Sequence, residues 1–229
     1  MANPSTTIYL AEQRGITQQD VIYRSWHTFN YKEYQDPHRE APGALRVFNE
    51  ETLAGGKQMA YTCLETGSVI LLPLVGGILV LAKGEAYELE AGGLLEFPLG
   101  KGEVYQVQNP YGDLVSYLQI EVQVDGFGEG TREGCPYYAI DPEQYHNALQ
   151  ALLPPQKTFQ LSIGKFDGRA DVAHDLTKAE KSCFVFVIDG VFEVQNCLLH
   201  ARDGLYLTDD ESIEFEALAN ETILMMLEF

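Results

Sequence analysis

An internal repeat of β-type segments constrains the fold of this chain more than any other feature. The segment LLPLVGGILV, followed by LEAGGLLEF, matches FVFVIDGVFEV, followed by LHARDGLYL, at an offset of about 110 residues. In each copy a strand, a tight glycine turn and a second strand precede another glycine-containing turn and strand. This order is typical of a small double-sheet barrel of the jelly-roll type, so the repeat predicts two such barrels in tandem.

Short apolar runs separated by glycine-rich turns extend this pattern over most of the chain. The runs between Gly43 and Val124 are rich in Val, Ile, Tyr and Phe, and residues 158–229 continue in the same way. Segments of this length and composition, spaced by turns, indicate an all-β sandwich or barrel. One β unit is therefore expected in each half of the chain.

Turn residues in the second repeat allow its strand pairing to be predicted. If Asp189–Gly190 forms a two-residue hairpin turn, the sulfur atoms of Cys183 and Cys197 point to opposite faces, so no disulfide joins them. The same register places five side chains in one apolar stripe that faces the barrel interior. These are Cys183, Val185, Val187, Phe192 and Val194.

The segment between the two β regions predicts a connector that contains a short helix. Asp141 is a suitable N-cap, Pro142 suits the first helical position, and the prolines after Leu153 end the helix there. The predicted organisation is an N-terminal barrel over residues 1–124, a connector over 125–156 and a C-terminal barrel over 157–229.

Charge and hydropathy exclude several classes of function. The chain has 15 Lys and Arg against 34 Asp and Glu, a formal charge of −19, so we expect no direct binding to nucleic acid or to a membrane surface. The longest apolar stretch, Ser68 to Ala82, is interrupted by Pro73 and Gly76–Gly77, which argues against a membrane span. The first residues do not resemble a signal peptide, and the four cysteines show no paired spacing. A cytoplasmic location with reduced thiols is therefore expected.

The segment from Ser25 to Gly56, SWHTFNYKEYQDPHREAPGALRVFNEETLAGG, resembles the N-terminal signature of the pirin family. This signature is an aromatic-rich strand, an Asp-Pro turn, and a GALRV stretch followed by Asn and acidic residues. Its most specific part runs from Gly43 to Glu51, and over the C-terminal half the resemblance is one of pattern. The resemblance implies an all-β bicupin, in which two tandem cupin barrels of the RmlC-like jelly-roll type are joined by a short helical connector. It also implies that the N-terminal barrel usually holds one iron.

The pirin-type iron site implied by this resemblance uses three histidines and one glutamate, in two pairs whose members are one residue apart. Residues i and i+2 of a strand face the same side, so two such pairs can enclose one ion. The four ligand positions can be located in this sequence by counting from the glycine turns. None of the residues at these positions carries an imidazole or a carboxylate. The former ligand positions are Thr62, Leu64, Tyr105 and Val107.

Other polar residues near these positions do not restore a metal site. A shift of one residue brings Cys63 and Glu65 into the first pair, and Glu103 lies close to the second. Such a set mixes soft and hard donors without an imidazole, which suits neither iron nor structural zinc. Since no histidine occurs between His38 and His146, we expect neither a metal nor another cofactor in this barrel.

The C-terminal half contains two histidines that we interpret as surface or turn residues. His174 is followed by Asp175, but adjacent residues on a strand face opposite ways, so this pair is not expected to act together. His200 stands directly before a predicted turn.

Three functions follow from these observations. The leading hypothesis is a metal-free pirin-like bicupin that binds a small molecule in the N-terminal barrel or has a regulatory role with a protein partner. Tyr105 would then either anchor a polar ligand or fill the space that an ion left. The second hypothesis is a metal-independent isomerase or lyase acting on a small polar substrate, with Tyr105 facing Glu65 or Glu103 as the general base. The third, an iron-dependent quercetin dioxygenase, is the one that the missing ligands disfavour most.

Overall fold

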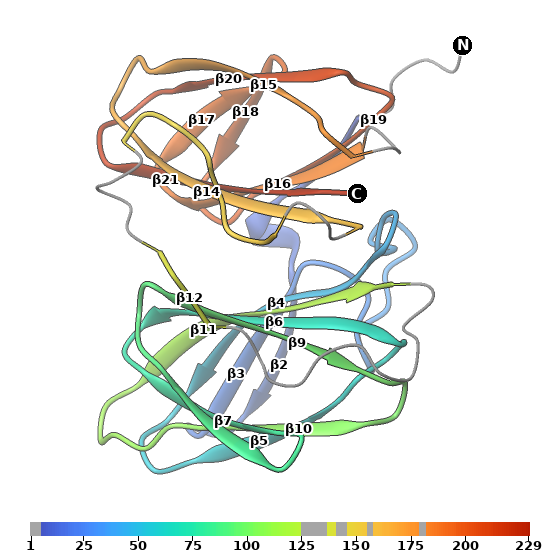
Figure 1. The fold of residues 1–229 in the computed structure, drawn as a ribbon, viewed down its shortest axis with the longest axis vertical. Coiled ribbons are helices and arrows are strands. Elements are labelled where there is room, and N and C mark those ends of the chain that lie inside the picture. The colour runs from blue at the N-terminus through green and yellow to red at the C-terminus, as the bar shows by residue number, and fades with distance from the viewer. Residues whose placement is uncertain (1–5, 125–136, 141–145, 155–157, 179–181) are drawn as a thin grey trace. The chain divides into compact units, whose positions relative to one another are not determined.

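All regular structure in the described part of the chain is β-strand, except for one 3₁₀ turn, η1 (Ala11–Gln13). The all-β class expected from the sequence is therefore confirmed (Figure 1). Within these residues no helix has the length and apolar character that a membrane crossing requires. The computed structural model describes residues 6–124, 137–140, 146–154, 158–178 and 182–229.

The chain divides into two compact units, each built from a large and a small antiparallel sheet. The N-terminal unit is Arg14–Ile140. The C-terminal unit combines Met1–Gln13 with Asp141–Phe229. The two tandem barrels expected from the repeat are thus present.

The large sheet of the N-terminal unit has seven strands, and the small sheet has four. In sheet order the large sheet is β12 (Tyr137–Ala139), β9 (Gly93–Leu99), β6 (Gly67–Val75), β11 (Val115–Gln123), β4 (Leu45–Leu53), β3 (Tyr23–His27) and β2 (Gly15–Gln19). The small sheet is β5 (Gln58–Thr62), β10 (Val104–Gln108), β7 (Ile78–Ala82) and β8 (Glu85–Leu89).

The C-terminal unit repeats this design with sheets of six and four strands. The six-stranded sheet is β1 (Thr6–Tyr9), β19 (Gly204–Thr208), β16 (Ser182–Asp189), β21 (Thr222–Glu228), β14 (Gln160–Phe166) and β13 (Gln150–Ala151). The four-stranded sheet is β15 (Asp171–Asp175), β20 (Ser212–Ala217), β17 (Val191–Val194) and β18 (Cys197–His200).

The core of each unit lies between its two sheets, because alternate residues of a strand point to the same face. The predicted apolar stripe from Cys183 to Val194 is confirmed, since all five of its members belong to the core of the C-terminal unit. That core cluster consists of aliphatic and aromatic side chains, methionine and cysteine. Burial of each large apolar side chain contributes about 2 kcal/mol to folding.

The turn at Asp189–Gly190 is a corner between sheets and not the predicted hairpin. β16 pairs with β19 and β21, whereas β17 pairs with β18 and β20. On both sides of such a corner, every second side chain points to the interior of the unit. The residues that face the interior were therefore predicted correctly, although the strand pairing was wrong. Cys63, Cys183 and Cys197 are free thiols, as expected.

Each unit has a tight hairpin one strand after its corner between sheets, and the two hairpins occupy equivalent places in the repeat. Lys83–Gly84 joins β7 to β8 with φ angles of 54° and 80°, and Gln195–Asn196 joins β17 to β18 with φ angles of 46° and 61°. Two consecutive residues with positive φ match the right-handed twist of the flanking strands.

The helix predicted to end at Leu153 is absent from the described residues. Residues 141–145 lie outside them, and the remainder of the segment forms β13 and a bridge from His146 to Lys165. The amide of Leu152 donates to the carbonyl of Leu161 at 2.8 Å. Pairing with the open edge of β14 has therefore outweighed the local capping signals.

Each unit also takes a strand from beyond its predicted boundary. β1 pairs with β19, so the first strand of the chain belongs to the C-terminal unit. β12 pairs with β9 and extends the N-terminal unit to Ile140. The predicted divisions at residues 124 and 156 therefore do not match the compact units.

We predict that Tyr9→Ala destabilises the C-terminal unit by about 3 kcal/mol, because it removes a buried ring that contacts Phe184 edge to face at 6.0 Å. Hydrogen exchange of β19 amides should accelerate, while urea unfolding followed by the fluorescence of Trp26, the single tryptophan, should not change. Ile8→Ala, on a side chain that is 44% exposed, is the control and should have little effect. Unaltered exchange in β19 would contradict this assignment of β1.

Candidate functional site

Polar side chains replace apolar ones at one end of the interior of the N-terminal unit. They come mainly from the inward faces of β3, β4 and β11, where Ser25 lies opposite Glu51, and Asn49 lies opposite both His27 and Gln119. All are buried. We call this set the polar cluster: Tyr23, Ser25, His27, Tyr31, Asn49, Glu51, Tyr61, Tyr105, Tyr117, Gln119 and Glu121.

A chain of hydrogen bonds crosses the polar cluster from strand to strand. His27 Nδ1 donates to Asn49 Oδ1 at 3.0 Å, and Asn49 Nδ2 donates to Gln119 Oε1 at 3.2 Å. Gln119 Nε2 donates to the hydroxyl of Tyr105 at 2.7 Å. Burial lowers the pKa of His27, so the imidazole is neutral near pH 7, and its Nε2 accepts from the Thr17 hydroxyl at 2.8 Å.

Glu51 is a buried carboxyl whose hydrogen bonding is incomplete. Ser25 donates to its Oε1 at 2.8 Å, whereas Oε2 is buried and accepts no hydrogen bond of good geometry. Burial raises the pKa of Glu51 to about 7, although Tyr23, Ser25 and the charge of Lys32 act in the opposite direction. The group therefore changes its charge near neutral pH.

Glu121 is a second buried carboxyl at the other side of Gln119. Its Oε2 accepts from the amide of Leu64 at 3.0 Å, and Gln119 approaches Oε1 at 3.4 Å. Burial raises the pKa of Glu121 to about 7, and the backbone amide of Leu64 and the charge of Lys32 partly oppose that rise. Two carboxyls in the N-terminal unit, Glu51 and Glu121, can thus each gain or lose a proton close to pH 7.

The tyrosines of the polar cluster are neutral hydrogen-bonding groups, because burial raises the pKa of each hydroxyl. The hydroxyls of Tyr61 and Tyr117 lie 2.6 Å apart, and the rings of Tyr61 and Tyr105 stack with centroids 5.2 Å apart. Tyr31 enters from the segment between β3 and β4. Its hydroxyl is buried beside Gln119 without a hydrogen bond of good geometry.

The four predicted ligand positions do not all face the interior. Tyr105 and Val107 are buried, but Thr62 is exposed and Leu64 is 37% exposed, so that part of the prediction is wrong. Tyr105 pairs with Tyr61 across the small sheet, which turns Tyr61 inward and Thr62 outward. A shift of one residue reverses the face of every side chain on a strand.

Of the nearby polar candidates, Cys63 borders the polar cluster beside Glu121, whereas Glu65 and Glu103 lie outside it. Cys63 is buried and its thiol lies 3.0 Å from the carbonyl of Glu65, while burial raises the pKa of this thiol to about 12. Glu65 pairs with Lys101 at 2.8 Å, and Glu103 is exposed and accepts from the amide of Gly100. The hydroxyl of Tyr105 therefore meets Gln119, and the expected contact with Glu65 or Glu103 is not found in the described residues.

The inward residues do not fit the iron that the pirin resemblance implies. Tyr61 and Tyr105 carry neutral hydroxyls that bond to other protein groups, Cys63 stays protonated, and Val107 has no donor atom. No imidazole stands among these four residues. Such a set lacks the neutral nitrogen and carboxylate donors that an iron ion of this kind requires.

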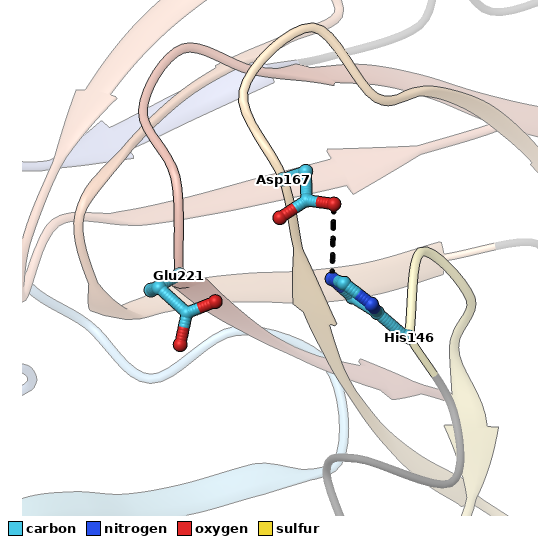
Figure 2. A group of neighbouring side chains, drawn as sticks. All are labelled: His146, Asp167 and Glu221. Atoms are coloured by element: carbon cyan, nitrogen blue, oxygen red, sulfur yellow. Dashed lines mark ion pairs between the residues drawn. The ribbon is translucent and has the colours of Figure 1, made fainter.

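A group of potential cation ligands does occur on the surface of the C-terminal unit (Figure 2). One ligand atom from each of His146, Asp167 and Glu221 lies within 4.8 Å of the others. His146 Nε2 and Asp167 Oδ2 are 3.2 Å apart. However, Glu221 already pairs with the ammonium of Lys165 at 2.6 Å, and this positive charge opposes the binding of a cation.

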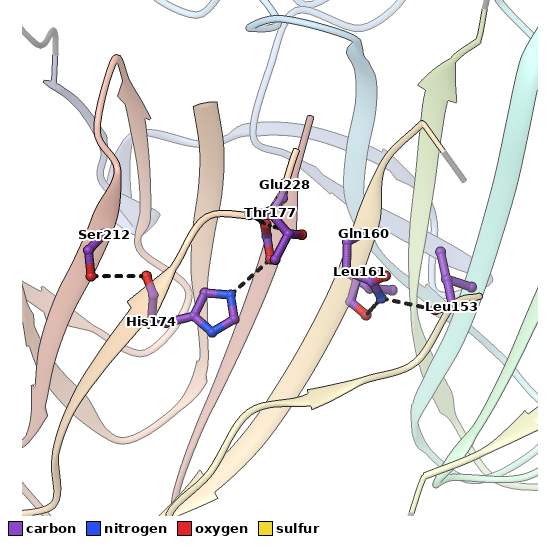
Figure 3. A network of polar contacts seen from close by, with 7 residues as sticks. All are labelled: Leu153, Gln160, Leu161, His174, Thr177, Ser212 and Glu228. Carbon is purple, nitrogen blue, oxygen red and sulfur yellow. Dashed lines mark hydrogen bonds and ion pairs between the residues drawn. The ribbon is translucent and has the colours of Figure 1, made fainter. Parts of the chain in front are cut away.

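His174 has a partner that sequence reasoning missed (Figure 3). Its Nε2 lies 2.9 Å from Glu228, and the amide of Thr177 donates to the same carboxylate at 2.8 Å. Burial raises the pKa of Glu228, but the hydrogen bonds from His174 and Thr177 outweigh that effect and lower it. His174, interpreted from the sequence as a surface or turn residue, is therefore a half-buried residue of β15 with a carboxylate partner. His200 is exposed, as expected.

The residues of the polar cluster had a recognisable signal in the sequence. In LRVFNEETL, Asn49 and Glu51 alternate with outward residues between Val47 and Leu53, and β11 shows the same pattern at Gln119 and Glu121. Polar side chains on the inward face of a central strand point to a site, because an unpaired buried polar group is costly.

Comparisons with known proteins agree on the fold. A model described as the quercetinase C-terminal cupin domain matches residues 153–226. A quercetin 2,3-dioxygenase of Escherichia coli (strain K12) is 23% identical over 226 residues, which cover 95% of this chain and 97% of the relative. The crystal structure of YhhW from Escherichia coli has a TM-score of 0.83 at 19% identity, and covers 98% of this chain and 97% of that chain. A second YhhW structure, described as a bacterial pirin in complex with nickel(II), has a TM-score of 0.80 at 18% identity. The match covers 98% of this chain and 99% of that chain.

The raised pKa of Glu51 predicts a pH-dependent stability of the N-terminal unit. A carboxyl with a pKa near 4.5 in the unfolded chain and about 7 in the folded chain binds its proton more tightly when folded, so its stability contribution is lost as pH rises from about 4.5 to 7. Relative to wild type, Glu51→Gln should gain about 3 kcal/mol between pH 5 and pH 8. The pKa of His27 is lowered, so the stability contribution of His27 changes with pH in the opposite direction. Because wild type and Glu51→Gln both contain His27, this contribution cancels in the comparison.

Urea unfolding monitored by Trp26 fluorescence measures this difference, because Trp26 lies on β3 beside the polar cluster. Glu103→Gln, on an exposed carboxyl, should follow the wild-type curve. Parallel wild-type and Glu51→Gln curves over this pH range would show that Glu51 titrates normally.

Proposed function

We propose that the chain is a bicupin of the pirin and quercetinase type and a metal-independent protein that binds a small molecule in the polar cluster of its N-terminal unit. One observation carries the proposal. The buried residues of β5 and β10 nearest the expected ligand positions are Tyr61, Tyr105 and Val107, with Cys63 directly after β5, and two buried carboxyls interact with this group.

The C-terminal unit provides an internal comparison for this proposal. It has a similar arrangement of strands, and the buried carboxyl of Glu228 in that unit accepts hydrogen bonds at both oxygens, from His174 and Thr177. Glu51 differs, because its Oε2 accepts no hydrogen bond of good geometry. Burying Glu51 and Glu121 reduces stability, and such a cost is typical of a binding or catalytic site. The unsatisfied Oε2 of Glu51 and hydroxyl of Tyr31 support a ligand in preference to simple filling.

A metal-independent isomerase or lyase is the second candidate function. The specific observation in its favour is that Glu51 and Glu121 have pKa values of about 7, which suits a general acid or base near neutral pH. These carboxyls replace Glu65 and Glu103, which the sequence had suggested as bases. A regulatory role with a protein partner stays a prediction.

Dioxygenase activity on quercetin, the activity named for the Escherichia coli relative, is the function we expect least. The inward donors do not fit iron, so no step can be derived through that metal with these residues.

Elemental analysis of the untagged protein should therefore find iron, nickel, zinc, manganese and copper far below one ion per chain, and added iron should not produce turnover of a flavonol. Escherichia coli YhhW, incubated with nickel and dialysed in parallel, is the positive control. The His146→Ala variant removes any metal held by the surface group. Stoichiometric metal that persists in His146→Ala and disappears in Cys63→Ala would contradict the proposal.

We also predict that ligands found by thermal-shift screening of a small-molecule library depend on the polar cluster. Glu51→Gln should weaken their binding by about tenfold, because it removes a charge that a buried donor group contacts. Glu103→Gln, which alters an exposed carboxyl of the same unit, should leave the dissociation constants unchanged. Equal effects of the two substitutions would place the ligand outside the polar cluster.

A further inference from the structure

We propose that the polar cluster recognises a small primary amine in its ammonium form, and that the side chain of Lys32 occupies the ammonium position in the structure. This inference rests on the proposed function and adds the chemical class of the ligand. The position of the Lys32 ammonium, the tyrosine rings that it contacts and the unpartnered oxygen of Glu51 carry the argument.

The ammonium group of Lys32 lies over the faces of two tyrosines of the polar cluster. Its Nζ is 4.8 Å from the ring centroid of Tyr31 and 6.0 Å from that of Tyr61. Distances within about 6 Å are those at which a cation is attracted by the electrons of an aromatic ring. In the part of the chain that the structure describes, Lys32 forms no ion pair within 4.0 Å, so these contacts define its position.

The positive charge of Lys32 acts on two carboxyls inside the barrel. It stabilises the charged forms of both Glu51 and Glu121, although neither is in direct contact with it. The two carboxyls are buried and lie in the same interior as Tyr61 and Tyr105. A positive group at this end of the barrel thus compensates for two carboxylates, whereas an anionic ligand would be repelled by them.

The unsatisfied atoms of the polar cluster favour a ligand that donates hydrogen bonds. Glu51 Oε2 can only accept when the carboxyl is ionised, and it has no donor of good geometry. An ammonium group carries three donors and no acceptor, and a free amine, which has no backbone tether like that of Lys32, can donate to this oxygen while it stays near the tyrosine faces. A neutral alcohol supplies one donor and no charge. Carboxylates and phosphates supply acceptors where donors are required.

Lys32 stands in a turn that displays its side chain towards the polar cluster. Tyr31 and Tyr34 form a bridge on either side of it, and Lys32 has a φ angle of 49°. A residue other than glycine in this left-handed region is strained, so the turn is held by its surroundings. Because the rest of Lys32 is exposed, its ammonium can leave for solvent when another ammonium takes its place.

Binding of three probes of similar size tests this inference: n-butylammonium, n-butanol and butyrate. We expect n-butylammonium to bind to wild type and about tenfold more tightly to Lys32→Asn, which removes the internal competitor and keeps a residue that tolerates positive φ. Lys57→Asn, on an exposed lysine of the same unit, is the matched control and should equal wild type. Adding Glu51→Gln to Lys32→Asn should abolish the gain. Dissociation constants come from calorimetry at one pH and ionic strength.

The outcomes separate this inference from the proposed function. If n-butanol or butyrate binds in a Glu51-dependent way and n-butylammonium does not, the amine class is wrong and the ligand site stands. If neither the three probes nor any library compound shows Glu51-dependent binding, both proposals fail. Equal affinity of wild type and Lys32→Asn for n-butylammonium would overturn the role of Lys32 as the internal ligand.

Discussion

The burial of two carboxyls, one of which has an oxygen that accepts no hydrogen bond of good geometry, is the constraint on which the polar end of the N-terminal barrel depends. Glu51 and Glu121 occupy inward positions of central strands, where a barrel normally places apolar side chains. Ser25 donates a hydrogen bond to Glu51, and Gln119 and the amide of Leu64 donate to Glu121, which makes this burial tolerable. Because these carboxyls gain and lose protons near neutral pH, they provide the groups that the proposed ligand binding or proton transfer would use.

The two halves of the chain show how one strand plan can accommodate different interiors. Both halves turn a corner between sheets and then form a tight hairpin, at Lys83–Gly84 and at Gln195–Asn196. In the C-terminal unit Phe166, Phe192 and Phe215 pack edge to face and fill the core. In the N-terminal unit, hydroxyl-bearing rings take much of the equivalent space. A tyrosine in place of a phenylalanine nearly keeps the volume and adds a hydrogen-bonding group, and such groups form part of the proposed site in the N-terminal unit.

Much of the fold could be predicted from the sequence, since alternation and glycine turns report on local backbone geometry. The apolar stripe from Cys183 to Val194 is an example. Features decided by distant pairing could not be predicted. Pairing with the edge of β14 forms β13 where the sequence predicted a helix. A difference of one residue in register places Tyr61 inside the barrel, where Thr62 was expected. The contact of His174 with Glu228 joins residues that only the folded sheet brings together.

Carbon-13 NMR titration of the glutamate carboxyl groups tests the central claim most directly, because it reports the charge of each carboxyl in the folded protein. The account predicts that Glu51 and Glu121 titrate near pH 7. A bound ligand should shift the Glu51 and Glu121 signals before any other. Titration of both buried carboxyls near pH 4.5, with no response to any ligand that binds the protein, would contradict a recognition site built on them.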